Sequence, residues 1–460
     1  MGWQGRPVAL APVQHRRGEG TAVARRSRIL VGTAALAALA LVHRQSPGAP
    51  VGAIHTVNAW RHQTPVHSPL SPAALLQGLR AALSRNGAHR HAAAQVEALL
   101  EERYAPRAVL LTESGTAALT AALVGLQRDH EAQVVAIPAY SCYDVATAVE
   151  GAGARALLYD IDPRTLGPDL VQVEAALRRG ATAVVVAHLY GCPVDLTTVK
   201  RLAVAAGAVV IEDAAQGAGA TMSARPVGTH GSLGVLSFGR GKGLTGGRGG
   251  ALLAFDDRGA RALERVRGML AEPRRGWTEL GLISAQLLLE RPALYGLPAS
   301  LPFLHLGETI YREPRPLRTS ATASCAIVAA TWRLADREAE VRRANAERLL
   351  LELRQQPGFA VIETSPTARP GYLRLPVITS PHARRAATQA AARRLGVMPG
   401  YPQPLCDLQP FATRCLNRND AFRGSRLLAE RLCTFPTHGR LDAGDLAGLE
   451  RWIREWGRSQ

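Results

Sequence analysis

The chain has 460 residues, of which 47% are hydrophobic, so it can bury a full core and divide into more than one domain. Its formal net charge of +18 suggests a nucleic-acid-binding protein, but residues 1–67 alone contribute eight arginines against one acid. The remaining charge is spread along the chain without a basic block or interleaved aromatics. Composition therefore argues against nucleic acid as a partner and favours an anionic small substrate.

Residues 1–67 form an N-terminal extension with one apolar segment, residues 29–42. Its fourteen residues, all apolar except Thr33, would make a helix of about 21 Å, which is shorter than a hydrocarbon core of about 30 Å. A disordered extension, a weak membrane anchor and a secretion signal are the three hypotheses, and we expect the first. The extension carries none of the chemistry described below.

From residue 68 onward, short apolar runs alternate with helical patterns. Helical spacing extends over residues 71–104, and the later runs with the length of strands are VLLT (109–112), QVVAIPAY (133–140), RALLYDID (155–162), TAVVVAHLYG (182–191), AVVIEDAAQ (208–216), LGVLSF (233–238) and GGALLAF (249–255). Runs of Val, Ile and Leu between amphipathic helices predict an α/β fold, with a mostly parallel sheet flanked by helices. Ligands of such sheets bind at the carboxyl ends of the strands, so we expect the chemistry in the loops there.

The last third of the chain has a different pattern. A long helix is predicted over residues 322–355, and residues 356–460 have the pattern of a smaller α+β unit. We therefore predict a large α/β domain over residues 68–330 and a small C-terminal α+β domain over residues 331–460.

Lysine is rare in this chain, because only Lys200 and Lys242 are lysines among its 55 basic residues. A guanidinium can replace an ammonium in surface charge, but it cannot lose a proton and condense with an aldehyde. Lys200 lies in a helical pattern, where a solvated charge explains it. Lys242 lies in SFGRGKGLTGGRGG (237–250), a glycine-rich loop between two predicted strands.

Three interpretations of this glycine-rich loop compete. A P-loop fails because Gly243 stands where Ser or Thr is required. The dinucleotide pattern GxGxxG matches at Gly241, Gly243 and Gly246, but a strand follows instead of a helix. The third interpretation is a lysine that binds an aldehyde cofactor between glycines that permit close approach. A solvated loop cation is the alternative.

An aldehyde cofactor such as pyridoxal phosphate (PLP) needs more than an amine. Asp213, which ends the run VVIED, would keep the ring nitrogen protonated, although a helix N-cap is its alternative role. A phosphate needs backbone amides at a helix start together with hydroxyls. The candidates for the phosphate are Ser114, Gly115, Thr116 and Ser237, the candidate for the phenolic oxygen is Gln216, and the candidate for stacking on the ring is Tyr143. A helix cap, a turn residue and a core residue are the respective alternatives for Ser114, Gln216 and Tyr143.

Together these motifs resemble those of the DegT-type aminotransferases, which act on nucleotide-linked keto-sugars and have the type I fold of PLP-dependent enzymes. The resemblance covers about residues 68–455, and its motifs are SGTAAL, IPAYSC, HLYGCPVD, VIEDAAQ, SFGRGK, GGRGGALL, YPQPL and FPTHGRL. It implies that Lys242 carries PLP as a Schiff base and that Asp213 pairs with the ring nitrogen. It also implies that Gln216 approaches the phenolic oxygen, while Ser114, Gly115, Thr116 and Ser237 bind the phosphate.

Two positions depart from the pattern of this family. Relatives often have the stacking aromatic at the position of Cys142, next to Tyr143, so the stacking residue is Tyr143 or another aromatic. Many relatives also carry a G-x-N-[YF]-R segment whose Asn reaches the phosphate of the neighbouring subunit, and residues 308–325 have no such Asn. The resemblance still implies a homodimer, without that contact.

The resemblance implies a PLP-dependent transaminase. It would move an amino group from glutamate or glutamine to a keto-sugar, in polysaccharide or secondary-metabolite biosynthesis, and relatives also aminate cyclitols. A PLP-dependent sugar dehydratase, which typically has His in place of the lysine, and a catalytically silent binding or regulatory protein are the alternatives. The six cysteines show neither a CxxC pair nor metal-ligand spacing, so we expect a reduced, cytoplasmic protein without a metal site.

Overall fold

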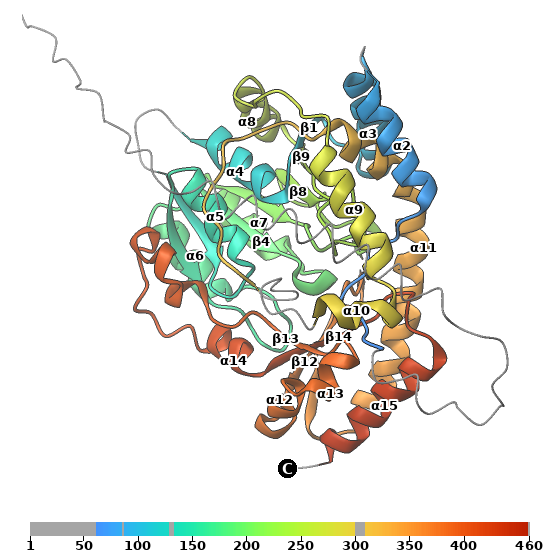
Figure 1. Cartoon of the computed structure of the whole chain (residues 1–460). Coiled ribbons are helices and arrows are strands. Elements are labelled where there is room, and N and C mark those ends of the chain that lie inside the picture. Colours follow the sequence, from blue (N-terminus) through green and yellow to red (C-terminus); the bar gives the residue numbers. More distant parts are fainter. Residues whose placement is uncertain (1–60, 85–86, 128–132, 300–308, 459–460) are drawn as a thin grey trace, which may run out of the picture. The chain divides into compact units, whose positions relative to one another are not determined.

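The computed structural model describes residues 61–84, 87–127, 133–299 and 309–458 (Figure 1). The apolar segment 29–42 and most of the predicted extension lie outside the described residues. Within the described ranges, no helix is both long and apolar enough to cross a membrane.

A seven-stranded sheet forms the centre of the fold, in the order β1-β9-β8-β5-β4-β2-β3. Its strands are β1 (Ala108–Thr112), β2 (Val134–Pro138), β3 (Arg155–Tyr159), β4 (Ala183–Ala187), β5 (Val209–Asp213), β8 (Leu233–Ser237) and β9 (Gly250–Ala254). Only β9 runs against its neighbours, β1 and β8, and the other pairs are parallel. The predicted α/β fold with a mostly parallel sheet is confirmed, and the carboxyl ends of β1, β5 and β8 meet at one edge.

Helices cover both faces of this sheet because the strands are apolar on both sides. One face packs against α4 (Gly115–Leu126), α5 (Tyr143–Gly151) and α8 (Asp257–Arg267). The opposite face packs against α3 (Ala88–Tyr104), α6 (Leu170–Arg178), α7 (Thr197–Ala205), α11 (Thr322–Leu353) and α14 (Arg423–Arg431). The result is a three-layer arrangement with the strand ends left for the loops.

A second, four-stranded antiparallel sheet lies in the last third of the chain, in the order β10-β12-β14-β13. Its strands are β10 (Phe359–Val361), β12 (Leu375–Thr379), β13 (Met398–Pro399) and β14 (Leu432–Phe435). Their core includes the end of α11, α12 (Pro381–Ala387), α13 (Ala390–Arg394) and α15 (Ala443–Gly457). Since α11 continues through residue 330 and contacts α2 (Pro72–Leu83), α3 and α15, the predicted domain boundary there stays a prediction.

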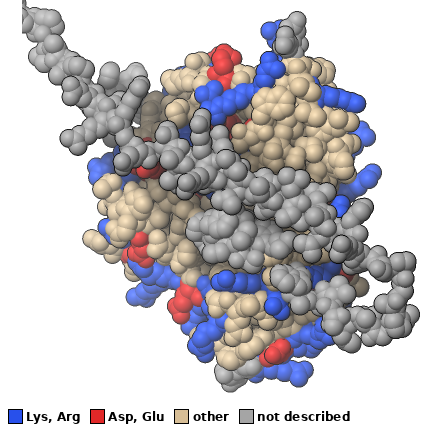
Figure 2. Space-filling model, viewed as in Figure 1, with Lys and Arg blue, Asp and Glu red and all other residues tan. Residues whose placement is uncertain are grey.

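The remaining elements connect these parts. The helices α9 (Trp277–Leu289) and α10 (Pro292–Ala299) follow α8, and β6 (Thr221–Met222), β7 (Arg225–Pro226) and β11 (Ala368–Arg369) form a small third sheet. On the face shown in Figure 2, basic side chains lie in several separate groups with acidic side chains between them. This distribution agrees with the even spread of charge along the sequence.

Candidate active site

The loop between β8 and β9 holds Lys242 between two glycines with left-handed backbones. Gly241 has φ 71° and Gly243 has φ 80°, a region that residues with a Cβ rarely adopt. A Cβ on Gly243 would lie 2.9 Å from Ala218 Cβ and 3.0 Å from Arg342 Nη1. The predicted need for glycine beside Lys242 therefore has a steric cause as well as a conformational one.

Lys242 lies within electrostatic range of Asp213 and Cys142. Burial raises the pKa of the Asp213 carboxyl, while the backbone N–H of Ala215 (3.0 Å to Oδ1) and the ammonium of Lys242 oppose this shift. Burial also raises the pKa of the Cys142 thiol to about 12, and Lys242 opposes this shift too. The amine and the carboxylate that the sequence assigned to one cofactor thus converge at neighbouring strand ends.

The start of α4 supplies the predicted anion site. Ser114 is the N-cap, and its Oγ accepts a hydrogen bond from the N–H of Ala117 at 3.0 Å, so the capping role considered for this residue is present. The N–H groups of Gly115 and Thr116 belong to the first turn, where no helical carbonyl is available to them. These two amides, with the positive end of the helix dipole, suit a phosphate.

Ser237 closes this site from the end of β8. A Cβ on Gly115 would lie only 2.7 Å from Ser237 Cβ and 3.1 Å from its Oγ, so the hydroxyl lies directly against the helix start. A Cβ on Gly239 would lie 3.5 Å from the same Oγ and 3.8 Å from Lys242 Cγ. The structure therefore brings the two halves of the predicted phosphate site together and places the Lys242 stem beside them.

Gln216 bridges two tyrosines. Its Oε1 accepts a hydrogen bond from the backbone N–H of Tyr190 at 2.6 Å, and its Nε2 donates one to the hydroxyl of Tyr401 at 2.7 Å. Tyr190 has φ 58°, an uncommon backbone conformation for a non-glycine residue, and the hydrogen bond from its N–H to Gln216 helps to hold this conformation. One proton of Nε2 is left for a ligand, because an amide nitrogen carries two.

Tyr143 lies in the core cluster that contains Val145 and Phe411, and its side chain is 4% exposed. Its hydroxyl contacts Gln403, and burial raises its pKa. Its neighbour Cys142 lies within electrostatic range of Lys242. Stacking of Tyr143 on a cofactor ring stays a prediction, and the core position considered as its alternative is the one observed.

A buried pair that the sequence reasoning missed supports the Asp213 strand. Glu212 is 0% exposed and accepts hydrogen bonds from His188 Nε2 at 2.7 Å and from the N–H groups of Gly228, His230 and Gly231. Burial alone would raise the pKa of this carboxyl, but these donors outweigh burial and hold it below its ordinary value. The only available signal was an acid next to Asp213 in an apolar strand, which a sequence cannot assign to partners 16 to 24 residues away.

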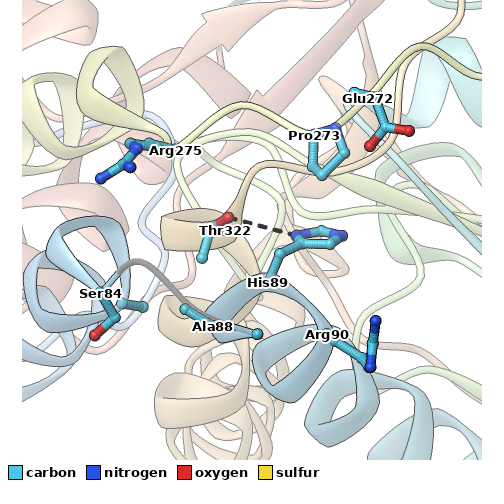
Figure 3. Close-up of a pocket in the computed structure, with 10 residues that line it drawn as sticks. Ser84, Ala88, His89, Arg90, Glu272, Pro273, Arg275 and Thr322 are labelled. Atoms are coloured by element: carbon cyan, nitrogen blue, oxygen red, sulfur yellow. Dashed lines mark hydrogen bonds between the residues drawn. The ribbon is translucent and has the colours of Figure 1, made fainter.

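The described residues also line a cavity of about 310 Å³, and Figure 3 shows the side chains around it. It is lined by residues around the starts of α3 and α11, among them His89, Arg90, Arg275 and Thr322, and His89 lies 3.5 Å from the Thr322 hydroxyl. None of the predicted site residues lines it. The strand-end cluster, rather than this cavity, has the groups for cofactor chemistry.

The groups at the strand ends suit PLP. They comprise an amine (Lys242), a carboxylate whose pKa burial raises (Asp213), and the amides of the first turn of α4 beside a hydroxyl (Ser237). The close contacts at Gly115 and Gly243 show that this cradle is built on glycines that could not carry a side chain without displacement. Such a set can hold a phosphorylated aldehyde, protonate its ring and exchange a proton at an amine.

Comparisons with known proteins give matches over much of the chain. The model of the DegT/DnrJ/EryC1/StrS aminotransferase family matches residues 77–282 and 321–449. An L-glutamine:2-deoxy-scyllo-inosose aminotransferase of Streptoalloteichus tenebrarius is 33% identical over 262 residues, which are 56% of this chain and 56% of that protein. A protein of the same name from Streptomyces kanamyceticus is 40% identical over 154 residues, 34% of this chain and 36% of that protein. The chain thus matches from about a third to about half of the length of these relatives.

Solved structures share the fold. The crystal structure of AtS13 from Actinomadura melliaura superposes with a TM-score of 0.67 and 22% sequence identity, covering 86% of this chain and 99% of that one. At this level of identity the likeness concerns the fold alone. It shows that the arrangement of sheets and helices around the Lys242 loop also occurs in a known protein.

Proposed function

Since the chain belongs to the DegT/DnrJ/EryC1/StrS aminotransferase family, we propose that it is a PLP-dependent aminotransferase that transfers the amino group of L-glutamine to a ketone carbon of a polyhydroxylated ring. The observation that carries this proposal is the convergence of Lys242, Asp213, the start of α4 and Ser237 at one edge of the central sheet. L-glutamine is the donor because the names of both relatives contain it.

Each residue has a distinct task in this proposal. PLP, when bound, supplies an aldehyde carbon that combines with amines and a ring that withdraws electrons. Lys242 provides the amine that holds it, while Gly115, Thr116 and Ser237 hold the phosphate. Asp213 keeps a proton on the ring nitrogen, and pairing with that cation would relieve the cost of its burial.

Lys242 also moves the proton of the reaction. When it is not bonded to PLP, its amine could accept a proton from the α-carbon of the donor and donate it to the cofactor carbon that was the aldehyde carbon of PLP. The flanking glycines carry no side chain that could hinder the lysine side chain. The carboxylate of Asp213 lies within electrostatic range of Lys242 and offsets part of its positive charge. Arginine, which fills nearly every other basic position, cannot perform this task because it does not deprotonate.

Lys200 makes this assignment testable, since it is the only other lysine of the chain. Borohydride reduction of the PLP complex followed by peptide mapping should find the modification at Lys242 and none at Lys200. Lys242→Ala should remove the absorbance band of the lysine-bound cofactor, whereas Lys200→Ala, an exposed change on α7, should keep it. A Lys242→Ala protein that kept both band and turnover would contradict the proposal.

The acceptor is the finer part of the proposal. The relatives are named for the cyclitol 2-deoxy-scyllo-inosose, and the resemblance of the sequence motifs points to nucleotide-linked keto-sugars. The protein whose cofactor L-glutamine has converted to the amine form should therefore be incubated with keto-cyclitols and, in parallel, with nucleotide-linked keto-sugars. Loss of the amine form of the cofactor identifies the acceptor, and loss of a hydroxyl from the sugar without amination would instead support a dehydratase.

We also propose a homodimer, which the family resemblance implies. Large apolar side chains are exposed on α2 and α9, namely Leu76, Leu79, Leu83, Trp277 and Leu288, with exposed fractions from 38% to 59%. Exposed apolar surface of this kind favours association. Sedimentation of the purified protein should give the mass of two chains, and a monomer at micromolar concentration would contradict it.

A further inference from the structure

Residues 61–68 form an irregular segment that leads toward α2 and contacts the Lys242 loop. A Cβ on Gly241 would lie 2.6 Å from Val66 Cγ2 and 3.6 Å from Val66 Cβ. The side chain of Val66 therefore packs directly against the backbone of the residue before Lys242. The family model begins to match only at residue 77, after this segment, which we call the strap.

Two contacts with the C-terminal part of the chain hold the first half of the strap. Arg61 Nη2 lies 2.6 Å from Asp445 Oδ2. Nε2 of His438 lies 2.7 Å from the carbonyl oxygen of Thr64, and His438 is 1% exposed. A carbonyl oxygen only accepts hydrogen bonds, so Nε2 is the nitrogen of His438 that carries the proton. Burial lowers the pKa of His438 to about 3, so the ring is neutral near pH 7.

Two further contacts join the strap to the segment around α10. The N–H of His62 donates to the carbonyl oxygen of Pro292 at 2.9 Å. His67 Nδ1 lies 2.9 Å from Glu290 Oε2, and the two side chains are 8% and 15% exposed. Glu290 and Pro292 belong to residues 283–320, which lie between the two stretches that the family model matches. The strap is therefore bound by two parts of the chain that are distant from it in sequence.

The contacts of Thr64 and His67 flank the contact with the Lys242 loop. Thr64 is two residues before Val66, and His67 is the residue after it. Consecutive Cα atoms are only about 3.8 Å apart. Val66 therefore cannot move far from Gly241 while both flanking contacts are kept.

The Lys242 loop needs support of this kind because glycines flank the lysine. Gly241 and Gly243 have left-handed backbones, and glycine loses more conformational freedom on ordering than any other residue. A loop that adopts many conformations presents its amine in the reactive position for only part of the time, and that fraction scales the rate of reaction. The strap restricts Gly241, while Ala218 lies against Gly243. Both glycines beside the lysine are thus restrained from outside the loop.

We infer that the strap positions Lys242 for its reaction with PLP, with Val66 as the contacting residue and Glu290 as the anchor that keeps Val66 in place. This inference rests on the proposed function, and it adds a positioning element from outside the stretches that the family model matches. The strap acts through the loop, by raising the fraction of time in which the amine is in the reactive position. The last residues of the predicted extension thereby become part of the site.

Stopped-flow absorbance of the cofactor-free protein mixed with PLP tests this inference. The rate at saturating PLP reports bond formation at Lys242, and the PLP concentration that half-saturates this rate reports initial binding. Val66→Ala should lower the saturated rate about three- to tenfold, the range for loss of two methyl groups from a part-buried contact. The half-saturating concentration should stay within about twofold of wild type, a split that general destabilisation would not produce.

Two control variants accompany Val66→Ala. Val66→Ile keeps both branches of the side chain, so its saturated rate should lie within about threefold of wild type. Val194→Ala is the matched control, because Val194 is 6% exposed and its Cγ1 would lie 3.9 Å from a Cβ on Gly167, in a different loop. Val194→Ala should lower the thermal stability and leave the saturated rate unchanged.

A double variant tests the anchor. Glu290→Ala removes the partner of His67 and should lower the saturated rate about two- to fivefold. Glu290 is also within electrostatic range of Arg240, two residues before Lys242, so a direct effect of charge is the competing explanation. If the anchor acts through Val66, the variant with both substitutions should be no slower than Val66→Ala alone. Effects that multiply would overturn the anchor role of Glu290.

These rates separate the strap from the proposed function, because they require neither L-glutamine nor turnover. Selective slowing in Val66→Ala, in a protein that does not transfer amino groups, would reject the aminotransferase and keep the strap. A wild-type saturated rate in folded Val66→Ala would overturn the inference, even where wild type transfers amino groups. If Val66→Ala does not fold, an unchanged saturated rate in Glu290→Ala would overturn it. Wild type that forms no absorbance band with PLP would reject both proposals.

Discussion

Gly115→Ala places a methyl group between the two walls of the proposed phosphate site. The added Cβ would lie 2.7 Å from Ser237 Cβ, whereas carbon atoms in contact are separated by about 3.5–4.0 Å. The start of α4 and the end of β8 must therefore move apart by about 1 Å. Both belong to elements packed in the sheet and helix layers, so neither can move without cost.

Two opposing effects set the stability of this variant. Overpacking of a buried contact costs about 1–3 kcal/mol, while replacing glycine by alanine in a helix gains about 0.5–1 kcal/mol. We expect a net loss of about 1 kcal/mol for the cofactor-free protein. The loss of affinity for PLP should be larger, about 10- to 100-fold, since the phosphate would lose charge-assisted hydrogen bonds whose donors no longer converge.

The assay compares PLP with pyridoxal, which lacks the phosphate, by fluorescence titration of the cofactor-free protein. Gly115→Ala should weaken PLP and leave pyridoxal close to wild type. Gly281→Ala on α9 is the control, because a Cβ there meets no atom within 4 Å and should stabilise by about 0.5 kcal/mol without changing PLP affinity. Equal weakening of both ligands, or unchanged PLP affinity, would refute the assignment of the phosphate to this helix start.

Three further predictions concern charge and backbone. Burial raises the folded-state pKa of Asp213, so its ionised form destabilises the cofactor-free protein as pH rises above the unfolded value near 4. Asp213→Asn should then be more stable than wild type in urea at pH 7, equal to it in acid, and inactive in amino transfer. The pKa of Glu212 is lowered, so its contribution to stability is present at neutral pH and is lost as the pH falls through its folded-state pKa. Glu212→Gln should therefore reduce the free energy of unfolding by about 2–4 kcal/mol at pH 7, and the urea unfolding of this variant should be less sensitive to acid. Gly243→Ala, at φ 80° and against Arg342, should slow reaction of PLP with the protein amine at least tenfold in stopped-flow absorbance while the fold, by circular dichroism, is kept.

Local patterns made much of the fold predictable. The strands of the central sheet are apolar on both faces, so each appears as a continuous run whose end is marked by a polar residue or glycine, as at Asp213 and Ser237. The Lys242 loop was predictable for a related reason, since only glycine tolerates the backbone on either side of the lysine. These signals depend on a few neighbouring residues, and a sequence displays them directly.

Long-range contacts were not predictable in the same way. Gln216 donates a hydrogen bond to Tyr401, which lies 185 residues later in the chain, and no local pattern around either residue predicts this contact. Tyr143 shows a different limit, because the motif names it for stacking while the structure places it in the core cluster that contains Val145 and Phe411, so its stacking on a cofactor ring stays a prediction.

Two charged residues around the site differ in what surrounds them. Burial lowers the pKa of Arg342 to about 10, and its side chain donates to the carbonyl oxygens of Gly371 and Ala218, each at 2.8 Å, while Nη1 is buried without a partner. Arg342 therefore joins the loop after β5 to the segment that leads into β12. Asp213 accepts a hydrogen bond from the N–H of Ala215, and burial still raises the pKa of its carboxyl. A protonated ring nitrogen beside this carboxylate would relieve the cost of its burial, which is why Asp213 argues for a cofactor with such a nitrogen at this site.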